Sequence, residues 1–341
     1  MIFNQIVSGG GGSAPAHYIE KDVDANGKLV GGTSIINLDG VTDIGNYGLY
    51  YAYINNTNAT GVLSSSTLTS ITGTSALRNA FYGCTGITGV SLSALTTIGG
   101  TTEVCNSAFY GCTGITSVDL SGLTSIIPTR ACASMFYGCT GITGALDLHS
   151  LSSISGDYTV ANMFYGCTGI TSVDLSGLTY LGGNYTFSDA FYGCTGITSV
   201  DLSGLIQITS YASLSNAFRN CTGITSVNLS NLTTATGISA CGSMFSGCTS
   251  LSNVDLSSVS SLTGSQAFAG MFGGCTSLTT LSFPALTATS FGSNTNQFNA
   301  MLSGVTGCTV HFPAAIQSTI ENWASVTSGF GGTNTTVLFD L

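Results

Sequence analysis

The octapeptide FYGCTGIT at residues 81–88 occurs verbatim five times in this chain, and looser copies follow. The verbatim copies begin at Phe81, Phe109, Phe136, Phe164 and Phe191, and the looser ones at Phe218, Phe245 and Phe272. The cysteines at the centre of these copies, from Cys84 to Cys275, are separated by steps of 27 or 28 residues. A fixed period of this size indicates a solenoid, in which each copy forms one turn of a single stacked domain.

The residues after each motif cysteine keep the same apolar pattern. After Cys112 the apolar positions are Ile115, Val118, Leu120, Leu123 and Ile126, and the same offsets recur after Cys194. The I-x-x-V-x-L part alternates as a short strand with one buried face requires. Because the period is that of leucine-rich repeats, the sequence predicts a β-rich solenoid of about ten turns.

Two local features predict departures from a plain strand. The segment after Cys139 reads ITGALDL, one residue longer than the usual ITSVDL, which predicts a β-bulge near Ala145. Before each octapeptide, a Ser, Asn or Asp precedes Ala/Met-Phe, and a Gly follows the Tyr. This order predicts one capped helical turn on the return side of each repeat, with the Phe in the core.

The repeat pattern also predicts the limits of the domain. Residues 1–16 are expected to form an N-terminal segment with a Gly-rich linker, and residues 17–32 a β-hairpin. The solenoid is expected over residues 33–313, with degenerate repeats at both ends. Residues 314–341 are expected to form a C-terminal cap of one helix and one strand, because terminal repeats must cover the open apolar ends of the stack.

Composition excludes several classes of function. Only 6% of the 341 residues are charged, the net charge is -10, and the five Lys and Arg residues are not clustered. This balance argues against nucleic acid or anionic lipid as a partner. No apolar stretch approaches the roughly 20 residues that span a bilayer, so no membrane insertion is expected, and the N-terminus does not read as a Sec signal.

The AFYGC motif, the ITSVDL strand and the closing segment HFPAAIQSTIENWASV together resemble the BspA-like bacterial leucine-rich repeats. The resemblance covers about residues 33–341. It implies a cell-surface adhesin or a phage-associated protein, although the export and anchoring segments of the surface members are not visible here. The family offers no catalytic residues to carry over.

The twelve cysteines invite a disulfide or metal interpretation, but their positions favour a structural one. Cys105, Cys132 and Cys241 fall where other repeats place Leu, Val or Phe, and Val305 replaces a motif cysteine. Equivalent side chains in stacked turns point in parallel, whereas a disulfide or a zinc site needs them to converge. The thiols are therefore expected to be small buried hydrophobes.

One polar position on each strand is the first candidate for a binding site. It lies between the Val and the Leu and is Asp at Asp119, Asp147, Asp174, Asp201 and Asp255. Neighbouring carboxylates would repel, which a bound ligand or a Ca²⁺ ion would relieve; otherwise the row is a solvated face that keeps the sheet soluble. No other cofactor and no metal centre are expected.

Two further motifs have a plain and a functional interpretation. The tyrosines of the octapeptide, from Tyr82 to Tyr192, form a row that packs against itself or binds sugar rings. DVDANG at Asp22–Gly27 resembles the start of a calcium loop, but Thr33 stands in place of the twelfth-position Glu, which favours an Asn-Gly hairpin turn.

Catalysis has no support in the sequence, because the three histidines are scattered and no nucleophile motif or phosphate loop is present. We therefore expect a non-enzymatic binding or adhesion protein that uses its polar strand face to hold a protein or glycan on a cell surface. The alternative is a structural spacer of a phage virion or surface layer without a ligand of its own. The location expected is accordingly cell-surface, extracellular or virion.

Overall fold

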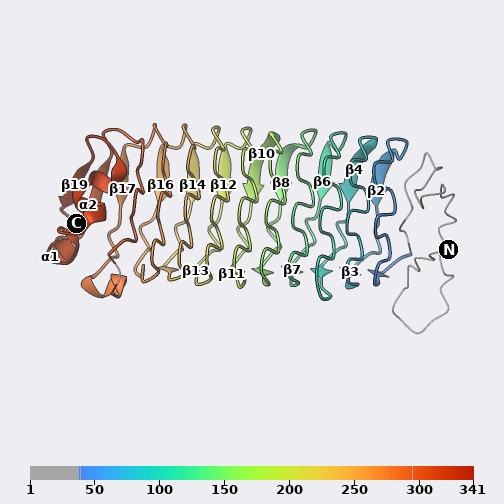
Figure 1. Cartoon of the computed structure of the whole chain (residues 1–341), viewed down its shortest axis with the longest axis horizontal. Coiled ribbons are helices and arrows are strands. Elements are labelled where there is room, and N and C mark those ends of the chain that lie inside the picture. The colour runs from blue at the N-terminus through green and yellow to red at the C-terminus, as the bar shows by residue number, and fades with distance from the viewer. Residues whose placement is uncertain (1–37, 39, 294) are drawn as a thin grey trace.

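A computed structural model describes residues 38, 40–293 and 295–341 of the chain. These residues form an elongated β-solenoid of about 11 turns (Figure 1). The expected linker, the hairpin over residues 17–32 and the loop Asp22–Gly27 lie outside the described residues. The stretch from Tyr47 to Ile71, which has little repeat signal, nevertheless forms regular turns: Tyr53 stacks on Phe81 with 5.1 Å between ring centroids.

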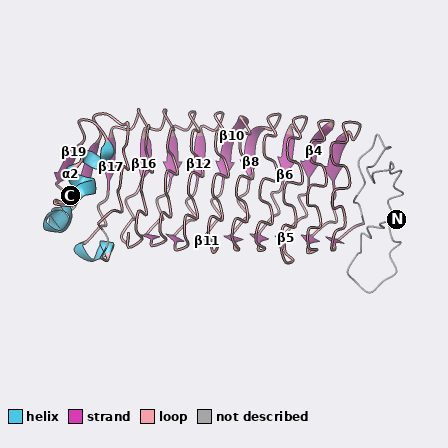
Figure 2. Cartoon of the chain, viewed as in Figure 1, coloured by secondary structure: helices cyan, strands magenta, loops and turns pink. Residues whose placement is uncertain are grey.

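Each turn contributes one strand to a row along one side of the stack (Figure 2). This row consists of β2 (Gly61–Ser64), β4 (Ile87–Ser91), β6 (Ser117–Asp119), β8 (Thr143–Asp147), β10 (Gly169–Asp174), β12 (Ser199–Asp201), β14 (Ser226–Asn228), β16 (Asn253–Asp255), β17 (Thr280–Ser282), β18 (Thr309–Phe312) and β19 (Thr336–Phe339). All pairs are parallel, and they form three sheets, β2-β4-β6, β8-β10-β12-β14-β16 and β17-β18-β19.

A second row of two-residue strands follows on the same turns. It consists of β1 (Asp43–Ile44), β3 (Ser70–Ile71), β5 (Thr97–Ile98), β7 (Ser125–Ile126), β9 (Ser153–Ile154), β11 (Tyr180–Leu181), β13 (Gln207–Ile208) and β15 (Thr234–Ala235). The first six of these strands form one parallel sheet, and β13 pairs with β15. The two rows hold the inward Val, Leu and Ile positions of the repeat on two sides of the core.

The irregularity predicted near Ala145 is present. Ile170 of β10 pairs with Gly144 and Ser172 with Ala145, so the register changes at this point. Gly144 has a φ of 85°, which glycine adopts without steric cost. The extra residue of this repeat is absorbed here, and β6 and β8 consequently belong to different sheets.

The return side does not contain the predicted helical turns. Glu103, Ser107 and Gly111, every fourth residue, have positive φ, and the other repeats show the same spacing. The amides of Ser107 and Phe109 donate to carbonyl oxygens of the next turn at 2.9 and 2.8 Å, whereas the amide of Ala108 closes a local turn. Asn and Asp tolerate the left-handed conformation, and Ser adopts it here as well, so the residues predicted to cap helices instead sit at the corners of successive tight turns.

The helices of the described residues all lie towards the C-terminus. They are η1 (Ala288–Phe291), η2 (Ala314–Ile316), α1 (Gln317–Ile320), α2 (Ala324–Thr327) and η3 (Gly329–Gly331). The side chains of Ile316, Ile320 and Val326 are buried, and Trp323 contacts Phe291 edge-on with 4.9 Å between centroids. The segment that the sequence predicts as one helix is thus several short ones, and β19 follows it.

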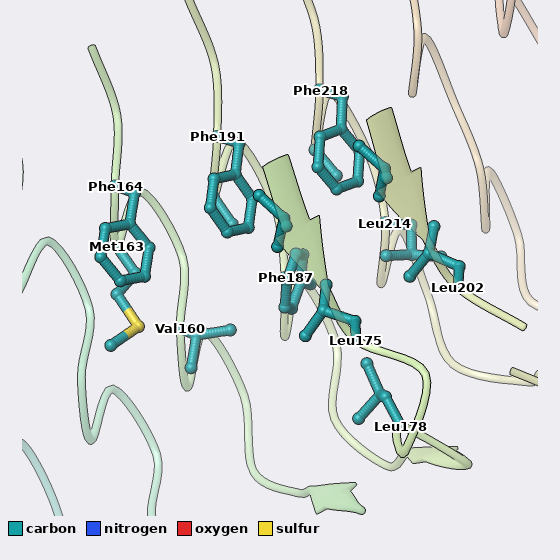
Figure 3. Packing of buried hydrophobic residues seen from close by; sticks show 14 of the residues in the cluster. Val160, Met163, Phe164, Leu175, Leu178, Phe187, Phe191, Leu202, Leu214 and Phe218 are labelled. Carbon is teal, nitrogen blue, oxygen red and sulfur yellow. The ribbon is translucent and has the colours of Figure 1, made fainter. Parts of the chain in front are cut away.

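The core is one continuous cluster of buried side chains, in which phenylalanines of successive turns lie beside Leu, Val and Met side chains (Figure 3). The octapeptide phenylalanines are at most 1% exposed, and from Phe81 to Phe218 neighbouring rings stack at 5.1 to 5.2 Å. This confirms the predicted inward Phe. Because each ring lies between two others, a turn is stabilised mainly by its immediate neighbours.

Candidate functional site

The outward position between the inward Val and Leu runs along the first row of strands, and we call this surface the strand face. Its members are Ser91, Asp119, Asp147, Asp174, Asp201, Asn228, Asp255 and Ser282, all of them partly or fully exposed. Their exposure agrees with the predicted outward direction.

Strand register decides which of the five predicted aspartates are neighbours. Asp174 of β10 pairs with Asp147 of β8 and with Asp201 of β12. Asp201 then pairs with Asn228, so that Asp255 lies one turn further on. Asp119 pairs with Ser91 in a different sheet, and the irregularity near Ala145 separates it from the others. The structure therefore brings three of the five together in register.

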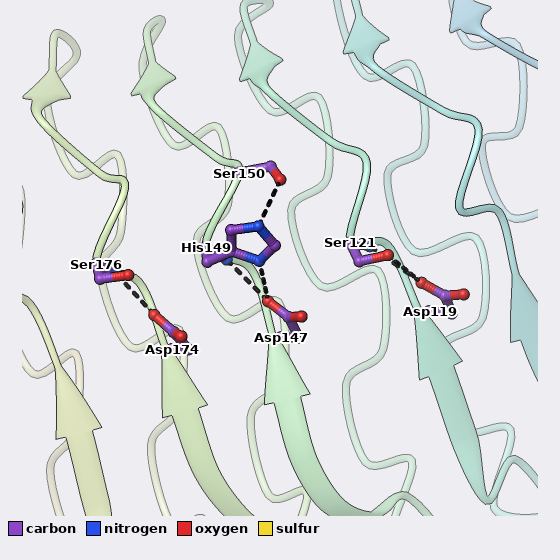
Figure 4. Close-up of polar contacts among 7 residues, drawn as sticks. All are labelled: Asp119, Ser121, Asp147, His149, Ser150, Asp174 and Ser176. Carbon is purple, nitrogen blue, oxygen red and sulfur yellow. Dashed lines mark hydrogen bonds and ion pairs between the residues drawn. The ribbon is translucent and has the colours of Figure 1, made fainter.

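Each strand-face carboxylate has a local structural role. Oδ1 of Asp174 accepts a hydrogen bond from the amide of Ser176 at 2.9 Å, and Oδ1 of Asp201 accepts one from the amide of Ser203 at 2.9 Å (Figure 4 shows the first). The same bond to the amide two residues on is made by Asp119, Asp147, Asn228 and Asp255. This Asx turn redirects the chain at the end of the strand.

The Asx turns explain why Asp or Asn occurs at the end of these strands. This structural role was not predicted from the sequence. The signal was present, because Asp-Leu-Ser or Asn-Leu-Ser recurs at the end of these strands. Asn228 shows that the turn needs an oxygen acceptor and not a charge. Two hydrogen bonds from Ser257, one from its side chain and one from its amide, lower the pKa of Asp255.

A groove lies on the strand face over β10, β12 and β14. Its volume is about 320 Å³. It is lined by Ser172, Val173, Asp174, Ser199, Val200, Asp201, Ser226 and Asn228. Among the described residues, Oδ2 of Asp174 and Oδ2 of Asp201 have no hydrogen-bond partner. Charges on neighbouring strands about 4.8 Å apart repel by about 1 kcal/mol in water, so a cationic or hydrogen-bonding ligand would be favoured here.

Asp147 has a partner that the other aspartates lack. Its Oδ1 lies 2.6 Å from Nδ1 of His149, and Nε2 of His149 lies 3.2 Å from Oγ of Ser150 (Figure 4). The hydrogen bond to Asp147 raises the pKa of His149, and the hydrogen bond from His149 lowers the pKa of Asp147. The side chains of Asp147 and His149 are each 55% exposed, so water surrounds the imidazole. This connectivity resembles a catalytic triad, but it lacks the enclosed site that nucleophilic catalysis uses.

Metal binding finds no support in the part of the chain that the structure describes. Within it, no group of three or more His, Cys, Asp or Glu side chains is placed to hold a metal ion. The strand-face carboxylates advance one per turn and each is engaged by its own Asx turn. They do not converge on one point as the ligands of Ca²⁺ must.

The motif cysteines do no surface chemistry. All twelve cysteines are unpaired and buried, as the sequence predicts. From Cys84 to Cys275, the thiol of each motif cysteine donates to the main-chain oxygen of the aromatic residue one turn back; Cys112 lies 2.9 Å from the oxygen of Phe81. Burial raises the pKa of these thiols, to about 11 at Cys84 and about 12 at Cys194.

The octapeptide tyrosines stack on one another. From Tyr82 to Tyr192 the centroids of neighbouring rings are 4.6 to 4.7 Å apart and nearly parallel. Because each inner ring is covered on both faces, Tyr110, Tyr137 and Tyr165 cannot offer ring faces to a sugar. The interpretation as a self-packing row is therefore the one that the geometry supports.

Comparison with known families agrees with this architecture. The family described as BspA type Leucine rich repeat region matches the chain in six copies, over residues 33–213, 134–270 and 162–303. The chain belongs to the BspA-type leucine-rich repeat family. Leucine-rich repeat proteins generally bind proteins and are typically non-enzymatic, and membership points to a protein-binding or surface role.

Several solved structures are similar to this chain. A leucine-rich repeat protein from Bacteroides ovatus is 20% identical over 89% of this chain and 78% of its own, with a TM-score of 0.39. The T. pallidum leucine-rich repeat protein TpLRR is 23% identical over 56% of this chain and 76% of its own, with a TM-score of 0.38. A leucine-rich cell-surface protein from Faecalibacterium prausnitzii is 16% identical over 87% and 83%, with a TM-score of 0.30.

Two results complete the comparison. The search of curated proteins found no match. Among the described residues, none of the helices has the length and apolar character needed to span a membrane.

Proposed function

We propose that this BspA-type protein is a non-enzymatic attachment protein that holds a protein partner on its strand face at a cell surface. The observation that carries the proposal is the groove over β10, β12 and β14. There Asp174, Asp201 and Asn228 stand in register beside a second row formed by Ser172, Ser199 and Ser226. A regular ladder of acceptors and hydroxyls on a parallel sheet suits an extended polypeptide segment.

Charge selects the kind of segment. Asp174 and Asp201 contribute two neighbouring negative charges to the groove, and the chain as a whole has a net charge of -10. A segment that carries Lys or Arg would relieve the repulsion between these carboxylates and would be steered to the surface by the overall field. The proposed partner is therefore a protein with a basic, extended segment.

The experiment replaces Asp by Asn, because the chain itself has Asn at the equivalent position of a neighbouring turn, Asn228. In Asp174→Asn/Asp201→Asn the Asx turns are retained, because Asn228 makes the same turn, and only the two charges are removed. Asp255→Asn is the matched control, since Asp255 has the same Asx turn on the same face but does not line the groove. The probe is a random array of immobilised twelve-residue peptides.

We expect the wild-type protein and Asp255→Asn to select Lys- and Arg-containing peptides, and the double variant to lose most of that binding. The binding should also weaken as salt is raised from about 50 mM to 0.5 M, because salt screens exposed charges. Equal selection by wild type and double variant, or no selection by either, would refute a ligand role for the groove.

A structural spacer is the second candidate, with a place in a virion or surface layer. One observation favours it. Every strand-face Asp and Asn side chain forms an Asx turn, so the occurrence of these residues at this position is explained by local structure without a ligand. The peptide array separates the two candidates, because a spacer predicts no charge-dependent binding by any of the three proteins.

A further inference from the structure

Exposed apolar side chains are concentrated on one part of the solenoid surface. Among the described residues eleven large apolar side chains are exposed, and six of them fall between residues 127 and 238. These six are Ile127, Tyr158, Tyr180, Ile206, Tyr211 and Ile238, with exposed fractions of 38 to 51%. All lie on a second-row strand, directly beside one, or at the start of the return side, on consecutive turns. Elsewhere this stretch carries mostly Ser, Thr and Gly.

The centre of this surface is built from tyrosines. We define the tyrosine patch as Tyr158, Tyr180, Tyr185, Ile206 and Tyr211. The rings of Tyr158 and Tyr185 stack at 4.9 Å, and the ring of Tyr211 stands at 71° to that of Tyr185 with 5.0 Å between centroids. The hydrogen bond that Tyr185 donates to Tyr211 raises the pKa of Tyr185 to about 12, because it stabilises the protonated hydroxyl. The side chains of Tyr158, Tyr185 and Tyr211 therefore support one another before any ligand arrives.

Among the described residues, Tyr180 and Tyr211 are exposed and neither is covered by a parallel ring, unlike the inner octapeptide tyrosines. A Cβ atom at Gly182 would lie 2.5 Å from Cε1 and Oη of Tyr180, so the end of the Tyr180 side chain lies close to Gly182, and the side chain is 47% exposed. Tyr211 is turned out of the Tyr158 and Tyr185 stack and is 41% exposed. Tyr180 and Tyr211 belong to consecutive turns.

Polar groups beside the rings are partly engaged and partly available. Oδ1 of Asp157 accepts from the amide of Asn184 at 2.8 Å, and Oδ1 of Asn184 accepts from the amide of Tyr211 at 3.1 Å. Oδ2 of Asp157 and Nδ2 of Asn184 have no partner among the described residues. The guanidinium of Arg130 lies 5.5 Å from the centroid of the Tyr158 ring. Arg130 also lies 4.0 Å from Glu103, which pairs with Arg78 at 2.6 Å, so these two Arg side chains, Glu103 and Asp157 together carry no net charge.

The size of the patch limits its occupant. The patch covers three turns about 4.8 Å apart and is about five extended residues wide, which gives roughly 240 Å². This is well below the roughly 800 Å² that each partner of a stable protein complex buries. The area suits a small ligand that offers apolar C–H faces to tyrosine rings and hydroxyls to amide and carboxylate groups.

We propose that the tyrosine patch is a second binding site, distinct from the strand face, for a neutral linear oligosaccharide that runs along the solenoid with sugar rings over Tyr180 and Tyr211. A neutral ligand fits a patch with one Arg and one Asp. A linear one fits a surface that extends over consecutive turns and has little depth.

Calorimetric titration of the full chain with four neutral hexasaccharides tests the site, using β-1,4-linked glucose, β-1,4-linked N-acetylglucosamine, β-1,3-linked glucose and α-1,4-linked glucose. At least one should bind at millimolar or lower concentration. Tyr180→Ala and Tyr211→Ala should each weaken that binding by about ten-fold or more, and Tyr180→Phe should retain it because the ring face remains.

Two controls keep the result specific. Tyr47→Ala removes an equally exposed tyrosine, 49% exposed, outside the patch and should leave sugar binding unchanged. Asp174→Asn/Asp201→Asn should also bind the sugar as wild type does, so the outcome is independent of the strand-face proposal. The proposal is overturned if none of the four sugars binds, if Tyr47→Ala weakens binding equally, or if sedimentation shows a dimer that Tyr211→Ala abolishes.

Discussion

Removing one ring from the middle of the phenylalanine column should weaken the solenoid more than removing one from its end. Phe136 is fully buried and stacks on Phe109 and on Phe164, each at 5.2 Å. Phe272 is equally buried, but its only stacked ring contact among the described residues is with Phe245, at 6.1 Å. Both Phe→Ala changes leave a cavity that costs about 3–5 kcal/mol. Phe136→Ala also loses a second, closer stacked pair, which adds about 0.5–1.5 kcal/mol.

Urea unfolding followed by far-ultraviolet circular dichroism measures both free energies of unfolding. We expect Phe136→Ala to be the less stable variant by about 1 kcal/mol, and both to be several kcal/mol less stable than wild type. Equal losses in the two variants would show that stacking adds nothing to burial in this column. An unchanged midpoint for Phe136→Ala would contradict the buried position itself.

The remaining predictions concern titratable groups. Burial raises the pKa of the thiols of Cys84 and Cys308 to about 11, above the ordinary value near 9, and that of the Tyr53 hydroxyl to about 12. The folded state therefore keeps protons that the unfolded state releases, so stability should be full below pH 9 and fall as the pH rises towards 11; a melting temperature that is constant from pH 8 to 11 would contradict this. Thiol titration at pH 8 should find few reactive groups in the native protein and about twelve after denaturation, and rapid labelling without unfolding would argue against the buried assignment. In an NMR titration His149 should show a pKa above the usual histidine value, and Asp147→Asn should lower that pKa. The pairing contributes its full stability to the folded state below the usual histidine pKa, and this contribution is lost as the pH rises through the raised pKa. An identical titration of His149 in both proteins would argue against the hydrogen bond.

Comparison of the repeats with one another was enough to predict the core. Each residue of one turn can be checked against its equivalents in the others, and a position that stays apolar in every copy, such as Phe136 or Leu120, must face inward. Cys139 and Val305 occupy the same position of the repeat, and both are buried. This redundancy also predicted the outward aspartates and the irregularity near Ala145, because an inserted residue has to be absorbed within its own turn.

The return side shows where such comparison is insufficient. A Ser before Ala-Phe suits the capping position of a helix, and by local preference alone a left-handed corner is the less common conformation for it. Ser107 adopts the corner, and its amide donates to the oxygen of Ala133 in the next turn. Hydrogen bonding between turns, which depends on the stacking, therefore outweighs the local preference of the residue.

The sequence by itself determined the solenoid, its period, its inward residues and the outward row of aspartates, since all of these repeat. The tertiary structure alone decided that the thiol of Cys112 donates to the oxygen of Phe81 and that Asp174 closes an Asx turn and lines a groove. It also placed the exposed side chains of Tyr180 and Tyr211 on consecutive turns, although they occupy different positions within their repeats. These features depend on the offset between neighbouring turns, and only the stacking of the chain on itself sets that offset.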